Sequence, residues 1–94
     1  GIENLMKLVA KVTKYPEDAW KQKAEGRVIL RFVVDEEGKM THPQILQSVR
    51  YDIDKEAIRA FEAIADVYRW SPGYQDGEAK RVKFTIPLYF RIPK

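Results

Sequence analysis

The sequence of 94 residues lacks most of the residues on which small catalytic or metal-binding domains depend. It has no cysteine, which excludes a disulfide framework, a thiol nucleophile and any cysteine-ligated metal site. Its single histidine, His42, precedes Pro43 and has no second histidine to complete a ligand set or a base–nucleophile pair. We therefore interpret His42 as a surface residue and expect a non-enzymatic domain with no cofactor and no metal.

Long hydrophobic runs and a strong charge of one sign are also missing. No stretch approaches the roughly 18 consecutive apolar residues of a membrane-spanning helix. The 17 basic and 14 acidic residues leave a net charge of +3, which is too small and too scattered to indicate nucleic-acid binding. The glycines are spread along the chain and form no phosphate-binding loop. These absences leave a single small domain, residues 1–94, as the interpretation.

The clearest positive pattern lies near the C-terminus, over residues 80–92. Hydrophobic residues occupy every second position there, which is the period of a strand with one buried face. Pro87 interrupts the pattern on its other face, and a proline has no backbone N–H to donate within a sheet. The side of the strand that Pro87 faces is therefore predicted to be an open edge. Lys83 and Thr85 would present their backbone groups on the same side, where another chain can pair.

The N-terminal part predicts two helices. Hydrophobic residues three and four positions apart predict an amphipathic helix over about residues 2–12. A second, short helix is predicted over about residues 16–24. Pro16 suits its first position, and the acidic residues Glu17 and Asp18 favour its N-terminal end. We expect Ala19 and Trp20 to anchor this helix and Gly26 to end it.

The middle of the chain predicts a hairpin. Residues 27–35 alternate with two fairly apolar faces, which favours a central strand, and the turn at Gly38 leads to a second strand over about residues 39–49. Pro43 implies that this second strand is an edge strand or contains a bulge.

A longer helix is predicted over about residues 53–68, capped by Asp52 or Asp54. Trp70 is interpreted as a core residue that closes the end of this helix. Together the elements predict an α+β domain, with a three-stranded antiparallel sheet in the order 2-1-3. The 53–68 helix would pack on one face, and the N-terminal helices would complete the domain.

Several short motifs then follow one another in a characteristic order over about residues 15–92. They are Tyr15-Pro16, Gly26-Arg27-Val28, Trp70-Ser71-Pro72-Gly73 and Gly77. In this order they resemble the C-terminal domain of TonB, the periplasmic energy transducer of Gram-negative bacteria. The turn from Pro72 to Gly77, with Asp76, and the ending Pro87-Leu88-Tyr89-Phe90 resemble the variants found in Bacteroidetes homologues.

The resemblance implies a function that the residues alone do not. Domains of this family bind the TonB box, a short extended segment of TonB-dependent outer-membrane transporters, by strand addition to their last strand. The parent protein is anchored in the inner membrane by an N-terminal helix, absent from this sequence, through which ExbB–ExbD supplies proton-motive energy for import. Strand addition agrees with the open edge predicted above. Transferred to this chain, the implied peptide-binding residues are Arg81, Val82, Lys83, Phe84, Thr85, Ile86, Thr13, Lys14 and Tyr15.

Three alternatives stay open at this point. A TonB-like domain also occurs on membrane sensor-peptidases, and TolA has a similar C-terminal domain. A small nucleic-acid-binding sheet is a reading of a different class, since Phe84, Tyr89 and Phe90 lie on a strand with basic neighbours. An exposed edge also allows a strand-exchanged homodimer.

Overall fold

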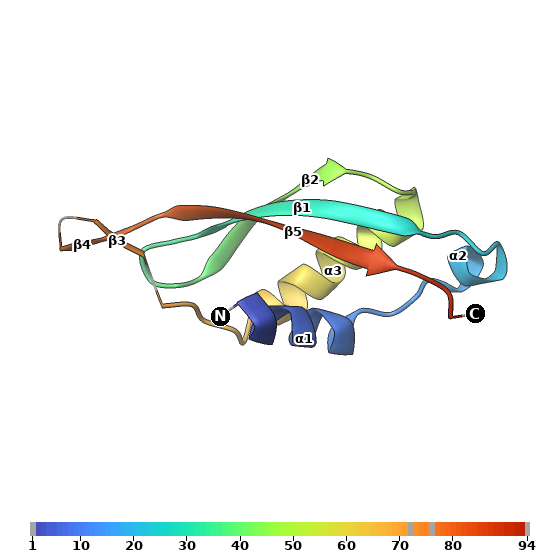
Figure 1. Ribbon diagram of the computed structural model, residues 1–94, viewed down its shortest axis with the longest axis horizontal. Coiled ribbons are helices and arrows are strands. Elements are labelled where there is room, and N and C mark those ends of the chain that lie inside the picture. Colours follow the sequence, from blue (N-terminus) through green and yellow to red (C-terminus); the bar gives the residue numbers. More distant parts are fainter. Residues whose placement is uncertain (1, 72, 76, 94) are drawn as a thin grey trace.

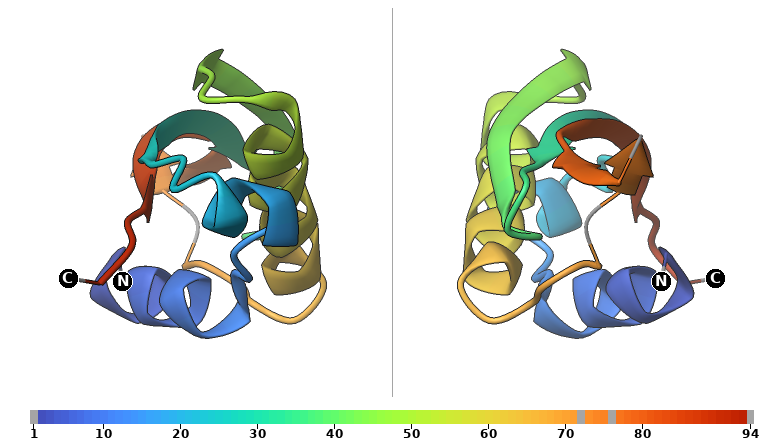
Figure 2. Two further views of the ribbon diagram at one scale, coloured as in Figure 1. Left: turned by 90° about the vertical axis from the view of Figure 1, so that its right-hand side faces the viewer. Right: turned by 90° about the vertical axis from the view of Figure 1, so that its left-hand side faces the viewer.

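A computed structural model describes residues 2–71, 73–75 and 77–93 as a sheet with helices on one side. The molecule is elongated, measuring 51 × 22 × 20 Å along its principal axes. Helices α1 and α3 lie on the same side of the sheet (Figures 1 and 2). The elements, in order, are α1 (Ile2–Val12), α2 (Glu17–Lys21), β1 (Gly26–Val34), β2 (Met40–Gln47), α3 (Tyr51–Ala65), β3 (Gly73–Gln75), β4 (Glu78–Lys80) and β5 (Val82–Phe90).

The main sheet is three-stranded and antiparallel, in the order β2-β1-β5. This confirms the predicted fold class, with the first strand in the centre and the last strand at one edge. β1 and β5 pair without interruption from Gly26 opposite Phe90 to Val34 opposite Val82. β1 alternates as predicted, with Val28, Leu30, Phe32 and Val34 buried, because side chains along a strand point to opposite faces.

The core lies between this face of the sheet and the two long helices. From α3, the buried residues repeat at helical spacing and are Ile53, Ala57, Ala60, Phe61 and Ile64. From α1, Leu5 is fully buried and Val9 nearly so, which confirms the amphipathic helix predicted over residues 2–12. Burying such a side chain contributes roughly 1.5–3 kcal/mol, so the position of α1 beside the sheet is fixed by packing.

The turn between β1 and β2 is built as the sequence predicted. Gly38 has a φ of 82°, a conformation that glycine adopts without a side-chain clash. The Asp35 carboxylate accepts hydrogen bonds from the backbone N–H groups of Lys39 and Glu37, both at 2.9 Å. The hydrogen bond from Lys39, aided by that from Glu37, lowers the pKa of Asp35. A Cβ on Gly38 would lie 2.0 Å from the carbonyl oxygen of Trp70, so no larger residue fits here.

The prediction for α2 was wrong at its C-terminal end. The helix ends at Lys21, and Gly26 instead begins β1. Lys23 has a φ of 53°, and the backbone N–H of Ala24 donates to the carbonyl of Ala19 at 2.8 Å, as in a helix end closed by a left-handed residue.

The expected anchoring of α2 is confirmed in part. Ala19 is fully buried, but Trp20 is 48% exposed, and its ring lies nearly perpendicular to that of Tyr15 with the centroids 5.3 Å apart.

α3 begins and ends earlier than the predicted residues 53–68, and its N-cap is not an aspartate. Arg50 occupies the N-cap position and makes no side-chain cap hydrogen bond. Asp54 instead reaches back to accept from the backbone N–H of Val49 at 2.9 Å and from the hydroxyl of Ser48. The helix ends at Ala65, and Trp70 follows in the connecting segment, where it is partly buried as predicted.

A short β3–β4 hairpin was not predicted. Gly73–Gln75 pairs antiparallel with Glu78–Lys80, and the hairpin extends past one end of the main sheet (Figure 1). Pro72 and Asp76 of the predicted turn lie outside the described residues. Because β4 ends at Lys80, β5 begins at Val82, later than the predicted start of the last strand. Within the described ranges, no helix has the length and hydrophobicity needed to cross a membrane.

Candidate functional site at the outer edge of β5

The outer edge of β5 is the main chain that faces away from β1. β5 is the last strand of the sheet order, so within the described residues no strand lies on its outer side. Pro87 pairs with Ile29. In an antiparallel pair, main-chain groups alternate between pointing toward the partner and away from it, and proline fits a position that points away. Lys83, Thr85 and Tyr89 share this alternation with Pro87, so their N–H and C=O groups face outward too.

The N-terminal half of β5 holds most of the residues that the sequence singled out. Phe84 packs on Trp70, with ring centroids 4.6 Å apart, and on Phe32 at 5.9 Å. Ile86 is buried, and the N–H and C=O groups of Phe84 and Ile86 alternate with those of Pro87 and so point toward β1. Neither residue therefore offers its main chain to a partner at the outer edge. Lys83 and Thr85 are exposed. The inward-facing Phe84 and Phe90 do not form a base-stacking surface.

Positive charge gathers on the open face beside this half of the strand. A shallow hollow of about 240 Å³ is lined by residues that include Arg31, His42, Arg81 and Lys83. Arg31 donates to Gln44 Oε1 at 2.6 Å, and Arg81 lies 3.6 Å from Glu36 Oε1. The remaining positive charge suits an acidic side chain at this point.

The second predicted group, Thr13 to Tyr15, lies at the other end of β5. The ring of Tyr15 meets that of Phe90 edge-on, 5.6 Å between centroids. Phe90 is six residues beyond Phe84, which corresponds to about 20 Å along a strand. The structure therefore does not bring Thr13–Tyr15 together with residues 81–86. The two predicted groups mark opposite ends of one edge.

Two residues of α3 hold this segment in place. Glu56 Oε2 accepts from the backbone N–H of Lys14 at 2.6 Å, and Arg59 Nη2 donates to the carbonyl of Val12 at 2.8 Å. Arg59 also pairs with Glu56 at 2.7 Å. Burial alone would raise the pKa of Glu56, but the hydrogen bonds from Arg59 and Lys14 outweigh it and lower the pKa.

Tyr15 is fixed separately. Its hydroxyl donates to the carbonyl of Ala24, and burial, with the negative charge of Glu25, raises its pKa. Thr13 follows α1, and its hydroxyl oxygen is buried and has no hydrogen-bond partner among the described residues.

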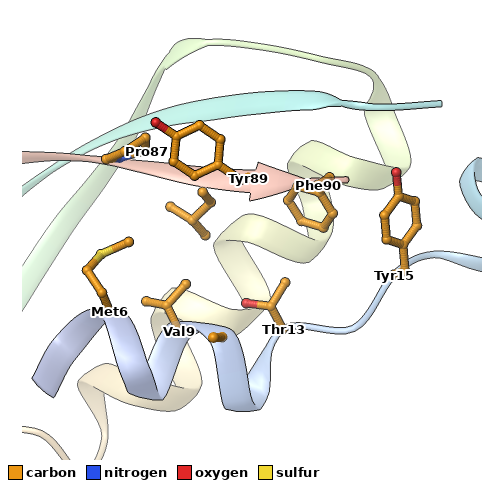
Figure 3. A pocket seen from close by; sticks show the side chains of 9 residues that line it. Met6, Val9, Thr13, Tyr15, Pro87, Tyr89 and Phe90 are labelled. Atoms are coloured by element: carbon orange, nitrogen blue, oxygen red, sulfur yellow. The ribbon is translucent and has the colours of Figure 1, made fainter. Parts of the chain in front are cut away.

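An apolar groove of about 290 Å³ opens between α1 and the C-terminal half of β5 (Figure 3). It is lined by Met6, Val9, Ala10, Thr13, Tyr15, Pro87, Leu88, Tyr89 and Phe90. Sequence reasoning missed this groove because it depends on how α1 packs against the sheet. The spacing of Met6, Val9, Ala10 and Thr13, which puts them on one helical face, was the available signal.

No group of three or more histidine, aspartate or glutamate residues is placed to hold a metal ion in the described part of the chain. What the site offers instead is an unpaired strand edge. Comparison with known families decides the family of the chain: the sequence model of the Gram-negative bacterial TonB protein C-terminal domain matches residues 11–92. The chain belongs to this TonB C-terminal family. Its domains are, in general, non-enzymatic and periplasmic, and they interact with outer-membrane transporters.

Solved TonB domains have the same fold. The longer of two Helicobacter pylori TonB C-terminal fragments, solved by NMR, has a TM-score of 0.80 and 16% sequence identity, covering 99% of this chain and 81% of that one. The shorter fragment has a TM-score of 0.71 and 17% identity, with coverages of 95% and 90%. The Pseudomonas aeruginosa TonB domain has a TM-score of 0.64 and 29% identity, with coverages of 87% and 80%. Among curated proteins, none is significantly similar in sequence to this chain.

Proposed function

We propose that this TonB domain binds the TonB box of an outer-membrane transporter by adding it, as a fourth strand, to the outer edge of β5. The observation that carries the proposal is the unbroken pairing of β5 with β1, which leaves a regular edge with no further strand outside it among the described residues. Each new backbone hydrogen bond contributes only about 0.5–1.5 kcal/mol net. Several must therefore form together, and a long regular edge allows this.

The charges near the strand favour a peptide that carries an acidic residue. Arg81 directly precedes β5 and Lys83 is its second residue, and both line the hollow with Arg31 of the neighbouring strand. Exposed ion pairs contribute about 0.2–1 kcal/mol and weaken as salt rises. Charge would therefore orient the peptide, while the backbone pairing supplies most of the affinity. Binding should depend on salt only weakly, unlike the binding of a nucleic acid.

The same proposal places the domain in a longer protein. The parent would be anchored in the inner membrane and driven by ExbB–ExbD, and the domain would transmit that energy to the transporter for import of its substrate. Membership of the TonB C-terminal family supports this placement.

The test is an NMR titration of the 94-residue domain with short N-terminal peptides of outer-membrane transporters. We expect chemical-shift changes along β5, strongest at the outward N–H groups of Lys83, Thr85 and Tyr89. If every transporter peptide leaves β5 unchanged, the domain serves another envelope protein, such as a TolA-like one or a sensor-peptidase.

A proline variant makes the test specific to backbone pairing. Thr85→Pro removes one outward N–H at a position with the same alternation as Pro87, so the sheet itself should tolerate it. We expect about tenfold weaker peptide binding, from the lost hydrogen bond and the unpaired peptide carbonyl. Thr85→Val is the matched control, because it keeps the N–H and the shape. Equal losses in both variants would show that the side chain, not the backbone, makes the contact.

The same edge could pair with a second copy of the chain. Sedimentation of the free domain at increasing concentration separates this case. If the domain is a strand-exchanged dimer, Thr85→Pro should lower its apparent mass toward that of a monomer. If it is a peptide-binding monomer, the apparent mass should not change.

A further inference from the structure

The groove between α1 and β5 has walls that are already fixed in the free domain. On one side, α1 is held by the buried side chains of Leu5 and Val9 and by the hydrogen bond from Arg59 to the carbonyl of Val12. On the other side, β5 is paired with β1 over its whole length. A binding site whose walls are fixed beforehand costs less to occupy, because little ordering is needed.

The groove borders the strand edge itself. Pro87 and Tyr89 line it, and both belong to the outward-facing alternation of β5. Figure 3 shows α1 running below this half of the strand, with Met6 and Val9 directed toward it. A strand added to β5 would lie about 4.8 Å further out. Its side chains would alternate, and every second one would point to the helix side, where the groove opens.

The size and chemistry of the groove select one kind of side chain. Its volume of about 290 Å³ is roughly twice that of an apolar cavity that accepts benzene. None of the described residues that line it is charged, so a buried charge would have no partner among them. A large aliphatic or aromatic side chain would instead be favoured by burial.

We propose that this groove receives one large apolar side chain of the peptide added to β5, so that the domain recognises sequence as well as backbone. The proposal rests on the function proposed above. Residues 2–10 of α1, which supply Met6, Val9 and Ala10, lie outside the stretch that the family's sequence model matches. The sequence of this wall is therefore not part of the stretch by which the chain was assigned to the family.

The first experiment is an alanine scan of the tightest-binding transporter peptide, measured by calorimetry against the intact domain. We expect the peptide to bind about tenfold more weakly when one particular apolar residue is changed to alanine. A second such position, if there is one, should lie on the same face of the added strand. Aspartate at the same position should bind more weakly still. A loss of affinity that is spread evenly over all peptide positions, while the chemical-shift changes along β5 persist, would overturn the groove proposal. Strand addition would then still stand.

The second experiment fills the groove. Ala10→Phe places a ring on an exposed groove residue of α1, and Asn4→Phe places the same ring on an exposed residue of α1 that does not line the groove. We expect Ala10→Phe to bind the parent peptide about tenfold more weakly, to the level of the alanine peptide, and to bind the alanine peptide as before. Asn4→Phe should keep the wild-type preference.

Two results would contradict the proposal. One is a preference for the large side chain that survives in Ala10→Phe. The other is self-association of the peptide-free wild-type domain that Ala10→Phe abolishes, because the groove would then hold a second copy of the chain. Failure of strand addition itself is recognised separately, since Thr85→Pro would then bind every peptide as the wild type does.

Discussion

The two edges of the sheet differ in their backbone, although both strands carry a proline. β5 pairs with β1 residue for residue, and only Pro87 lacks an N–H on its outer side. β2 pairs with β1 irregularly, with register shifts between Ile29 and Leu30 and between Arg31 and Val33. His42, next to Pro43, has a φ of 54°. Bulges and prolines are common devices that keep an edge from pairing with another chain.

The comparison teaches that composition alone does not decide which edge is available. Pro43 coincides with a left-handed residue and a register shift, so it belongs to a kinked edge. Pro87 sits within a regular ladder and removes a single donor. A proline in a strand therefore marks an edge, but the neighbouring backbone determines whether a partner can still add to it.

The largest expected effect comes from breaking the turn that holds β2. Gly38→Ala would force a side chain into the carbonyl of Trp70 and into an unfavourable φ, so we expect a loss of about 2 kcal/mol or more in unfolding free energy. Urea denaturation measures this. The ring of Trp70 packs on Phe84 of β5, so displacing Trp70 should also weaken peptide binding by the fraction that stays folded. Unchanged affinity in that fraction would mean that the turn and the outer edge of β5 are independent. Gly77→Ala is the matched control, since a Cβ there meets no atom within 4 Å although φ is 79°.

A smaller effect should come from restoring the missing donor of β5. Pro87→Val adds one outward N–H at the edge of the groove, and one more backbone hydrogen bond contributes about 0.5–1.5 kcal/mol. We expect peptide affinity to rise about two- to tenfold, measured by calorimetry. Pro43→Val in β2 is the control and should create no binding, because the register shifts remain. If Pro87→Val lengthened the paired segment without changing affinity, the missing N–H of Pro87 would have no effect on the strength of peptide binding.

The smallest effect should be the pH response of the contact that positions Thr13–Tyr15 near β5. The pKa of Glu56 is lowered in the folded state, so its charge contributes to the free energy of unfolding above the unfolded-state pKa of about 4.3. This contribution is lost as the pH falls through the folded-state pKa. We expect the stability difference between wild type and Glu56→Gln to shrink between about pH 5 and pH 3 in urea unfolding. A difference that stayed constant over this range would show that the Glu56 charge does not hold the segment.

Much of the fold follows from patterns that are local in sequence. The alternation in β1 and β5, the helical spacing in α1 and the turn at Gly38 each depend on neighbouring residues, so they were predicted correctly. The helix ends were less predictable, because a lysine, Lys23, adopts the left-handed conformation and Arg50 occupies the N-cap of α3. Neither residue is among those that usually take these positions.

The site was predictable only in part for a related reason. The open edge of β5 could be read from Pro87 and the alternation around it. The separation of Tyr15 from residues 81–86 could not, since it depends on the side-by-side position of Phe90 and the segment after α1. The groove likewise requires the packing of α1 against the sheet, which no short stretch of sequence encodes.

The kinked backbone of β2 also limits how large an assembly can become. A sheet with two straight rims could grow in both directions, and repeated addition would lead toward a fibre. Because His42 is left-handed and the register shifts beside Pro43 on one rim, we expect further strands to add on the other side only. The expected stoichiometry is one peptide for each domain, so a cell that contains many domains and many peptides would form discrete pairs and not a continuous polymer.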